Sequence, residues 1–434
     1  MSLFAITGNP VLHSKSPLLF DAAYPSHADT LACFRMAAQS AEEAVQLFDE
    51  LGLSGMNITA PFKSGVAQLA DVRAPEVQAL NACNTLTLED GKKCCYNTDI
   101  FGVLGSLENA GTPVAGKRCL VLGAGGAGSA AAYALHTAGG NVIIANRTVD
   151  KARRLSESTG CRYAGLDEVA DIVPQTDVIV NTLYRGVDVI DEAWLRPQHT
   201  IFDAVYHGST LQEKARRAGC KFVDGASWLL HQGVPAYRRF TGIAPDVEGM
   251  KKAMLPQKQP EHISLIGFMG AGKSTVAPLL ADMLGMNVLD VDATLEARCG
   301  ADIPQIMGEK GEAYFREQER AVLEEALASS TPTVISCGGG AVTQPSIGRQ
   351  LKENSVVVWL YAPVDSCVSR ISIDIDTRPL LAQHGNPQQA AAELFEKRKF
   401  LYAKAAWMLV SSAGRSAEQV SQLIYDEISK ALRS

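Results

Sequence analysis

Short apolar runs alternate with longer helical segments along the whole chain. In the first part of the sequence the apolar runs occupy residues 4–6, 55–58, 119–122, 142–145, 178–180, 201–203 and 222–223. Later runs occupy residues 263–266, 288–292 and 333–335. Short Val/Ile/Leu-rich strands separated by helices predict βαβ units and parallel sheets. The expected fold class is therefore α/β.

The regular alternation is interrupted between residues 250 and 262. This stretch is polar, contains Pro256 and Pro260, and has neither helical nor strand periodicity. Proline has no amide donor, so such a segment favours an extended linker. A new apolar run begins at Ile263. The pattern therefore predicts two parts joined by a linker.

Composition narrows the class of protein. A chain of 434 residues is long enough for about three domains. The hydrophobic fraction of 47%, the charged fraction of 20% and a mean hydropathy of +0.02 are typical of a globular protein. The formal net charge of −7 argues against a nucleic-acid partner, because the phosphate backbone requires a basic surface.

Cysteine spacing and the start of the chain bear on its location. The ten cysteines are dilute and show no Cys-x-x-Cys spacing, which disfavours a disulfide framework or a zinc site. The first residues lack the basic region of a signal peptide. Residues 119–146 carry no Asp, Glu, Lys or Arg and are long enough to span a bilayer, but six of them are glycine. We expect strand, turn, helix and strand there, no membrane span, and a reducing cytoplasm.

A glycine-rich turn in this stretch indicates a dinucleotide site. Six consecutive residues match G-x-G-x-x-G after a predicted strand and before a predicted helix: Gly123, Ala124, Gly125, Gly126, Ala127 and Gly128. Glycines let the backbone approach a pyrophosphate at the helix N-terminus. The second strand is followed by Asn146, Arg147, Thr148 and Lys151, where an NAD site usually has a carboxylate. Cationic and hydroxyl groups favour a 2′-phosphate, so we expect NADP.

Four polar clusters precede this turn, at residues 13–17, 57–63, 84–85 and 97–99, each just after an apolar segment. Singly, each is ordinary turn chemistry. Together they supply hydroxyls, amides, one carboxylate and lysine ammonium groups, which suit a small polyhydroxylated acid.

With the glycine-rich turn, residues 146–148 and Gln232-Gly233, these clusters resemble the shikimate dehydrogenase family over residues 1 to about 250. The resemblance implies NADP-linked interconversion of 3-dehydroshikimate and shikimate. It implies that Ser14 and Ser16 bind the substrate carboxylate. It further implies contacts to the ring from Thr59, Asn84, Asp99, Gln232 and Tyr206. Lys63, paired with Asp99, would move the proton at the reacting oxygen while the nicotinamide moves hydride.

Three positions depart from the family pattern. Ser129 stands where arginine is frequent, and Trp228 stands where methionine is usual, beside the expected reaction centre. The segment 181–186 is also atypical. These departures leave turnover and substrate fit open.

A second nucleotide motif lies beyond the linker. Residues 267–274 fit G-x-x-x-x-G-K-[ST] between a predicted strand and a predicted helix. We expect nucleotide contacts from Gly270, Ala271, Gly272, Lys273, Ser274 and Thr275. Asp290 and Asp292 are two apart in an apolar run, so a strand would point both carboxylates to one side. Arg316 and Glu319 are three apart on a predicted helix and can pair.

These motifs resemble the shikimate kinase family over residues 263 to 434, together with Gly338, Gly339, Gly340, Arg378 and Arg398. The resemblance implies ATP-dependent phosphorylation of the shikimate 3-hydroxyl. Asp292 would deprotonate that hydroxyl, and Ser274 and Asp290 would support Mg²⁺. Arg316 and Arg398 would bind the substrate carboxylate beside the three glycines. Arg378 would act from a lid over the phosphates, where Asp374 and Asp376 add charge that disfavours ATP.

The sequence thus predicts a bifunctional enzyme that uses NADP(H), ATP and Mg²⁺. The expected domains are an α/β substrate domain at 1–100 with a return at 228–250, a Rossmann NADP domain at 101–227, a linker at 251–262 and a P-loop kinase domain at 263–434. Two alternatives stay open: a quinate or cyclitol-acid dehydrogenase fused to another small-molecule kinase, and a non-catalytic sensing protein. The sequence leaves the oligomeric state and substrate transfer between the sites open.

Overall fold

The computed structural model describes residues 1–23, 30–184, 186–205, 209–255, 260–371 and 386–431. The chain forms two compact units. Unit 1 contains residues 1–17, 26–53 and 256–434, and unit 2 contains residues 18–25 and 54–255. Helix α1 (Ser16–Ala23) begins in unit 1 and continues into unit 2.

Unit 1 contains a run of parallel strands. Their order is β14 (Asn287–Asp290), β15 (Thr333–Ser336), β13 (His262–Ile266), β16 (Ser355–Tyr361), β17 (Met408–Ser411), β2 (Leu31–Ala37) and β1 (Ser2–Gly8). The central strand β16 is buried along its length, as expected for a parallel sheet covered on both faces.

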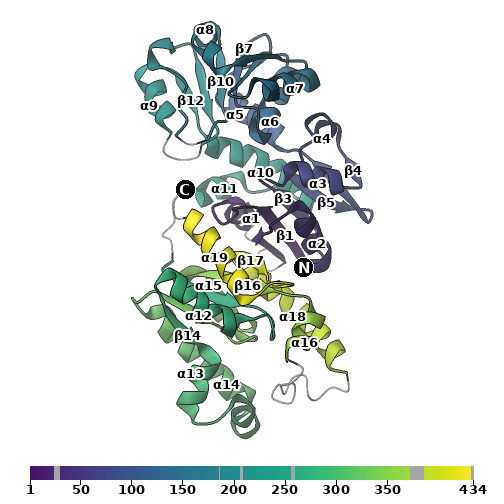
Figure 1. Ribbon diagram of the computed structural model, residues 1–434, viewed down its shortest axis with the longest axis vertical. Coiled ribbons are helices and arrows are strands. Elements are labelled where there is room, and N and C mark those ends of the chain that lie inside the picture. The colour runs from purple at the N-terminus through teal and green to yellow at the C-terminus, as the bar shows by residue number, and fades with distance from the viewer. Residues whose placement is uncertain (24–29, 185, 206–208, 256–259, 372–385, 432–434) are drawn as a thin grey trace. The chain divides into compact units, whose positions relative to one another are not determined.

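The helices of unit 1 are α2 (Ala41–Leu51), α12 (Lys273–Leu284), α13 (Val291–Cys299), α14 (Ile303–Ala328), α15 (Pro345–Asn354), α16 (Val364–Ile371), α18 (Pro387–Ala405) and α19 (Ala417–Ala431). Helices α12 and α19 pack against each other, as do α15 and α18. Figure 1 labels all four of these helices. Strands β15 and β17 contact the first pair, and β16 contacts the second.

The compact units differ from the domains that the sequence pattern suggests. Strand β17, close to the end of the chain, pairs in parallel with β2, so residues 26–53 pack with residues 256–434. Phe34 on β2 meets Trp359 on β16 with ring centroids 5.6 Å apart, and both side chains are fully buried. Arg415 also forms an ion pair with Glu43 on α2, 2.7 Å apart. The short-range sequence pattern of β17 or β2 does not indicate that these two distant strands pair with each other.

This pairing predicts that the two parts of the chain remain associated after the linker is cut. With a protease site in place of residues 256–259, the cleaved fragments should co-elute in size-exclusion chromatography at the volume of the intact chain. The reason is that separation would expose the edge of β2 and the buried Phe34, both unfavourable in water. Elution of two separate smaller species would contradict the strand pairing.

Unit 2 contains a six-stranded parallel sheet of the Rossmann type. Its strand order is β12 (Lys221–Val223), β11 (Thr200–Asp203), β10 (Val178–Asn181), β7 (Arg118–Leu122), β8 (Asn141–Asn146) and β9 (Arg162–Gly165). The chain order reverses between β7 and β10, and ligands bind such sheets at the carboxyl ends of the strands beside that point.

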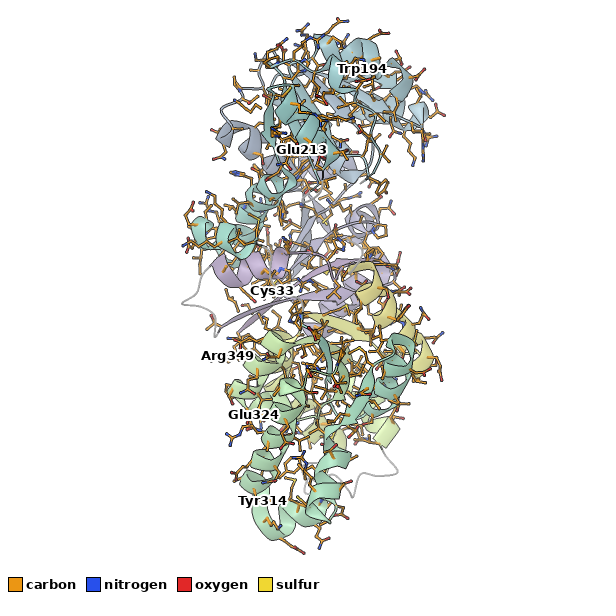
Figure 2. All side chains as sticks on the ribbon, turned by 90° about the vertical axis from the view of Figure 1, so that its left-hand side faces the viewer. Cys33, Trp194, Glu213, Tyr314, Glu324 and Arg349 are labelled. Atoms are coloured by element: carbon orange, nitrogen blue, oxygen red, sulfur yellow. The ribbon has the colours of Figure 1, made fainter. Side chains whose placement is uncertain are left out.

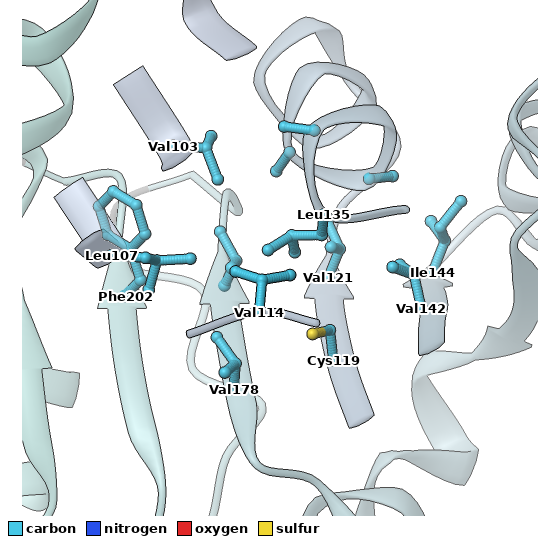
Figure 3. Packing of buried hydrophobic residues seen from close by; sticks show 14 of the residues in the cluster. Val103, Leu107, Val114, Cys119, Val121, Leu135, Val142, Ile144, Val178 and Phe202 are labelled. Carbon is cyan, nitrogen blue, oxygen red and sulfur yellow. The ribbon is translucent and has the colours of Figure 1, made fainter. Parts of the chain in front are cut away.

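Alternate residues of these strands enter separate cores. One cluster packs with α5 (Asp99–Asn109) and α6 (Gly126–Thr137) and includes Val121, Val178, Val180 and Phe202 (Figure 3). The other cluster includes the neighbouring residues Leu120, Leu122, Ile179 and Ile201. Residues i and i+1 of a strand face opposite sides, which explains why these runs are continuously apolar.

The remaining strands of unit 2 pair in the order β3 (Gly55–Ile58), β5 (Thr85–Glu89), β6 (Lys92–Tyr96) and β4 (Val72–Arg73). Asp90 and Gly91, both with positive φ, connect β5 to β6 in a tight hairpin. The hairpin brings the residue before β5, Asn84, next to the residues that follow β6. The other helices are α3 (Lys63–Leu69), α4 (Pro75–Leu80), α7 (Val149–Thr159), α8 (Val169–Ile172), α9 (Thr210–Arg217), α10 (Gly225–Thr241) and α11 (Val247–Ala253).

Residues 119–146 form β7, α6 and β8, as expected, and no helix among the described residues is long and apolar enough to cross a membrane. All ten cysteines lie in the described part of the chain and are free thiols there. The expected linker begins later than predicted, because α11 continues to Ala253.

Candidate functional site

An ion pair joins the first residues of helices α3 and α5 in unit 2. Lys63 is the first residue of α3 and Asp99 is the first residue of α5, and their Nζ and Oδ2 atoms are 2.5 Å apart. Their side chains are 19% and 11% exposed, so the pair is shielded yet reachable. Asp99 also donates its backbone N–H to Oδ1 of Asn97 at 3.1 Å, which fixes the start of α5. The expected Lys63–Asp99 pair is therefore present.

A buried network of polar side chains holds Thr98, the residue that precedes Asp99. Asn84 accepts the backbone N–H of Thr98 at 2.7 Å and donates to the Thr98 hydroxyl at 3.0 Å. Oε1 of Gln232, on α10, accepts hydrogen bonds from the Thr98 hydroxyl at 3.3 Å and from Asn84 at 3.4 Å. Asn57 donates to the backbone carbonyl of Asn84 at 3.2 Å. The structure thus brings together Asn84, Asp99 and Gln232 of the expected site, and adds Asn57 and Thr98 as supporting residues.

The glycine-rich turn adjoins the ion pair. A Cβ atom at Gly126 would lie 3.6 Å from Cδ of Lys63, so the lysine side chain reaches the N-terminus of α6. Thr59 lies at the carboxyl end of β3, and its carbonyl accepts the backbone N–H of Phe62, next to Lys63. Lysine, carboxylate and turn therefore share one side of unit 2.

The turn has the shape of a dinucleotide cradle. A Cβ at Gly128 would overlap the carbonyl of Gly123, so α6 approaches β7 as closely as only glycine allows. A Cβ at Gly125 would meet no atom within 4 Å, which leaves open space outside the turn. Amide donors at the helix N-terminus beside open space fit a pyrophosphate. Asn146 accepts the N–H of Ala124 at 3.3 Å and so ties the turn to the end of β8.

Basic residues follow β8 on the surface. Arg147, Thr148 and Lys151 are exposed, and Arg147 and Lys151 form no ion pair within the part of the chain that the structure describes. Arg153, which lies on α7 with Lys151, pairs instead with Asp150 and Glu157. Free cations at the end of the second strand fit the 2′-phosphate of NADP.

A cavity of about 250 Å³ lies at the carboxyl ends of β7, β10 and β11. Its lining includes Asn181, Asp203, Val205 and Ser209. Asp203 accepts hydrogen bonds from Nδ2 of Asn181 at 3.1 Å and from the hydroxyl of Ser209. The cavity occupies the reversal point of the sheet, where a ligand of this fold is expected. Sequence reasoning missed Asp203, although a carboxylate at the end of a predicted strand was a usable signal.

The structure does not place the other residues expected near the dehydrogenase reaction centre beside the Lys63–Asp99 pair. Trp228 is 6% exposed and packs on Phe202 and over Gly102, so it is part of the core between α10 and α5. Ser14 and Ser16 belong to unit 1, and their participation in the same pocket as Lys63 stays a prediction. Tyr206 lies outside the described residues.

The second site is the phosphate loop in unit 1, between β13 and α12. Gly267, Gly270 and Gly272 have positive φ values of 143°, 76° and 97°, which glycine adopts without strain. Lys273 is buried, and its ammonium donates to the carbonyls of Gly267 and Phe268 at 2.9 and 3.0 Å. These bonds fold the lysine across the loop.

The loop also presents groups suited to a nucleotide and its metal ion. A Cβ at Gly272 would meet no atom within 4 Å, so the loop borders open space that suits a nucleotide phosphate. Thr275 is exposed one residue after Ser274. The exposed hydroxyl of Ser274 and the carboxylate of Asp290 are oxygen donors of the kind that Mg²⁺ prefers.

The expectation that Asp290 and Asp292 point to the same side of one strand is wrong. Strand β14 ends at Asp290, and Asp292 lies in the first turn of α13, so strand alternation does not relate them. Asp290 is the N-cap of α13 and accepts the N–H of Ala293 at 3.1 Å. Asp292 instead points to the glycine loop, because its Oδ1 would lie 2.9 Å from a Cβ at Gly338.

Two arginines converge on the glycine loop that follows β15. Arg398, on α18, donates to the carbonyl of Gly339 at 3.2 Å and is buried. Arg316, on α14, lies against Gly340, where a Cβ would clash with its guanidinium. Figure 2 labels Tyr314 and Glu324 on the same helix. The structure therefore brings Asp292, Arg316 and Arg398 together around the three glycines, as expected.

A buried carboxylate completes this cluster. Glu319 accepts from Arg316 at 2.7 Å, which confirms the expected pair, and its side chain is fully buried. Burial raises the pKa of Glu319, and the Arg316 guanidinium opposes that shift. Its second oxygen has no hydrogen-bond partner within the described residues and lies against Gly338. Glu319 thus holds the Arg316 side chain at the loop.

One arginine of the second site was not anticipated. Arg370, on α16, donates to the carbonyl of Gly270 at 3.2 Å and to the carbonyl of Ser412 at 2.8 Å. It links the phosphate loop to the end of β17. The expected lid residue Arg378 lies outside the described residues, as do Asp374 and Asp376.

The two sites define a class of protein: a dinucleotide-dependent oxidoreductase joined to a P-loop phosphotransferase. Family models agree, matching the shikimate dehydrogenase substrate binding domain at residues 6–86, shikimate / quinate 5-dehydrogenase at 107–200, the shikimate 5′-dehydrogenase C-terminal domain at 229–255 and shikimate kinase at 269–429. The chain belongs to the shikimate dehydrogenase family and carries a shikimate kinase domain after it.

Individual relatives cover the first part of the chain. A shikimate dehydrogenase (NADP⁺) of Natronomonas pharaonis is 37% identical over 264 residues, which is 58% of this chain and 98% of the relative. The crystal structure of the Thermus thermophilus shikimate 5-dehydrogenase with NADP(H) and shikimate is 31% identical, with a TM-score of 0.54, and covers 58% of this chain and 98% of that one. A quinate dehydrogenase from Corynebacterium glutamicum with NAD is 28% identical, with a TM-score of 0.54, and covers 58% and 98%.

Proposed function

We propose that this chain reduces 3-dehydroshikimate to shikimate with NADPH in unit 2 and phosphorylates the shikimate 3-hydroxyl with ATP and Mg²⁺ in unit 1. The observation that carries the first assignment is Lys63, which forms an ion pair with Asp99 and whose side chain lies beside Gly126 of the dinucleotide turn. The second rests on the convergence of Asp292, Arg316 and Arg398 at the glycine loop, in the same unit as the phosphate loop. The product of the first reaction is the acceptor of the second.

In the reduction, Lys63 donates a proton to the carbonyl oxygen as that oxygen gains negative charge, and it withdraws the proton in the reverse direction. Asp99 orients the ammonium through their 2.5 Å contact. The bound nicotinamide supplies the hydride. Thr59, Asn84 and Gln232 would hold ring hydroxyls, Ser14 and Ser16 would bind the carboxylate, and Tyr206 would lie near the ring.

In the phosphorylation, Asp292 accepts the proton of the shikimate 3-hydroxyl. The hydroxyl oxygen bonds to the γ-phosphorus of ATP, and the bond between that phosphorus and the departing ADP breaks. Arg316 and Arg398 would bind the carboxylate of the ring. Lys273 would contact the β and γ oxygens, with Ser274 and Asp290 supporting Mg²⁺, which neutralises phosphate charge when bound. Arg378 would stabilise the transferring group.

The choice of dinucleotide gives a direct prediction. Arg147→Ala should raise KM for NADP⁺ about 10-fold or more and leave activity with NAD⁺ unchanged, because only NADP carries the phosphate that a guanidinium can bind. Steady-state kinetics with both dinucleotides measure the effect. Arg153→Ala, on the neighbouring helix, is the control because Arg153 is already paired. Equal losses with both dinucleotides would refute a phosphate contact.

A substrate panel tests the proposed function. Oxidation rates with shikimate and quinate, and ATP consumption with the same two acids, should both favour shikimate. Comparable or faster turnover of quinate would favour the alternative cyclitol-acid dehydrogenase, for which the similarity to a quinate dehydrogenase is the supporting observation. No turnover of either acid would favour a sensing protein.

A further inference from the structure

The segment that carries Ser14 and Ser16 is held by residues from the far end of the chain. Residues 11–15 form a loop between β1 and α1, and Ser16 is the first residue of α1. The N–H of Ser14 is bonded to the carbonyl of Val11 at 2.9 Å. The Ser14 and Ser16 hydroxyls lie 3.4 Å apart, so the loop presents them side by side. We call this segment the serine loop.

Glu427, on α19, anchors the serine loop. Its Oε2 accepts the backbone N–H of Val11 at 2.8 Å and of Leu12 at 2.9 Å. These residues are 416 and 415 positions away in sequence, and Glu427 is only 4% exposed. Burial raises the pKa of Glu427, and the two amide bonds oppose that shift. Two charge-assisted bonds to adjacent amides fix both the position and the orientation of a backbone segment.

A second contact holds the other end of the serine loop. Arg35, on β2, donates from Nε to the carbonyl of Ser14 at 2.8 Å and from Nη1 to the carbonyl of Trp407 at 3.2 Å. Its guanidinium lies 5.7 Å from the centre of the Trp407 ring. Trp407 directly precedes β17. The serine loop is thus held through Arg35 at one end and by Glu427 at the other, and both supports involve residues beyond the linker.

We propose that Glu427 is a positioning residue for the dehydrogenase reaction, holding the serine loop so that Ser14 and Ser16 can bind the carboxylate of the ring acid. The inference rests on the proposed role of the two serines. An element of the kinase part would then set the substrate affinity of the dehydrogenase part. Loss of Glu427 leaves two amides without their buried acceptor, so the loop shifts and substrate binding weakens, while the proton transfer at Lys63 is unchanged.

The test compares Glu427→Ala, Glu427→Gln and Ser14→Ala in the full chain. Glu427→Ala should raise KM for shikimate about 10-fold, the ratio that corresponds to one charge-assisted hydrogen bond. It should leave the dehydrogenase kcat, KM for NADP⁺ and the kinase activity within about twofold. Glu427→Gln should restore most of the affinity, since its amide oxygen can take the place of Oε2. Glu418→Ala, an exposed carboxylate on the same helix, is the control and should change nothing.

The outcomes separate this inference from the function on which it rests. If Ser14→Ala raises KM for shikimate and Glu427→Ala does not, the positioning role is wrong. If Ser14→Ala has no effect, the serine assignment is wrong, and the role of Glu427 is overturned with it. A parallel loss of dehydrogenase and kinase activities in Glu427→Ala would indicate a general structural role and also overturn the inference. Should Glu427→Ala not fold, Glu427→Asp withdraws the carboxylate by one methylene and should raise the same KM.

Discussion

Replacing Lys63 by methionine should lower the kcat of shikimate oxidation about 10²–10⁴-fold, the usual contribution of a positioned acid or base. This corresponds to about 3–5 kcal/mol of transition-state stabilisation. The ammonium of Lys63 pairs with Asp99, and the stem of the same side chain lies beside Gly126 of the dinucleotide turn. Methionine keeps most of the side-chain volume but can neither donate nor accept the proton. Initial rates of NADPH formation at saturating shikimate measure the effect.

Two controls make this result specific. Lys92→Met removes a solvent-exposed lysine of unit 2 and should leave both activities unchanged. The kinase activity of Lys63→Met should also be unchanged, because Lys63 belongs to unit 2 and the phosphate loop to unit 1. A dehydrogenase rate within a few-fold of the unmodified chain would exclude Lys63 as the proton donor.

Replacing Lys273 by methionine should lower the kcat of the kinase about 10²–10³-fold, the range found when one donor to a developing charge is removed. In the structure its ammonium is bonded to the carbonyls of Gly267 and Phe268 and is therefore held inside the phosphate loop. Loss of this cation removes a charge that would neutralise the β and γ oxygens. Shikimate-dependent ADP release measures the effect.

The matched control for this change is Lys430→Met, which removes an exposed lysine of α19 and should leave the kinase unaffected. The dehydrogenase activity of Lys273→Met should stay within about twofold of the unmodified chain. Undiminished ATP-dependent phosphorylation would refute the assignment of the phosphate loop.

Local sequence patterns were sufficient for the parts of both sites that one segment encodes. The G-x-G-x-x-G turn lies between β7 and α6 as expected, and the phosphate loop lies between β13 and α12. In each case glycines at fixed spacing demand a particular backbone, so a short window carries the whole signal. The Arg316–Glu319 pair is similarly local, three residues apart on one helix.

Features that depend on distant segments could not be predicted in this way. The pairing of β17 with β2 joins residues more than 370 positions apart, and neither strand has a pattern that names its partner. In the sequence, nothing distinguishes Glu427 from the other charged residues of an amphipathic helix. Only the structure shows that it accepts hydrogen bonds from the backbone amides of Val11 and Leu12. Asp292 was misassigned because an apolar run allows strand or helix equally, and Asp290 as N-cap decides for the helix.

The most direct test of the account is a single reaction with the purified full chain, 3-dehydroshikimate, NADPH, ATP and Mg²⁺. NADPH oxidation and release of ADP should both occur, and shikimate 3-phosphate should accumulate. Over the time that the unmodified chain needs to complete the reaction, Lys273→Met should accumulate shikimate with little phosphorylation. Lys63→Met should incorporate phosphate only at its reduced dehydrogenase rate unless shikimate is added. Oxidation of NADPH by the unmodified chain without any phosphorylated product, or phosphorylation in Lys63→Met at the unmodified rate without added shikimate, would contradict the claim that the two sites of one chain perform both steps in sequence.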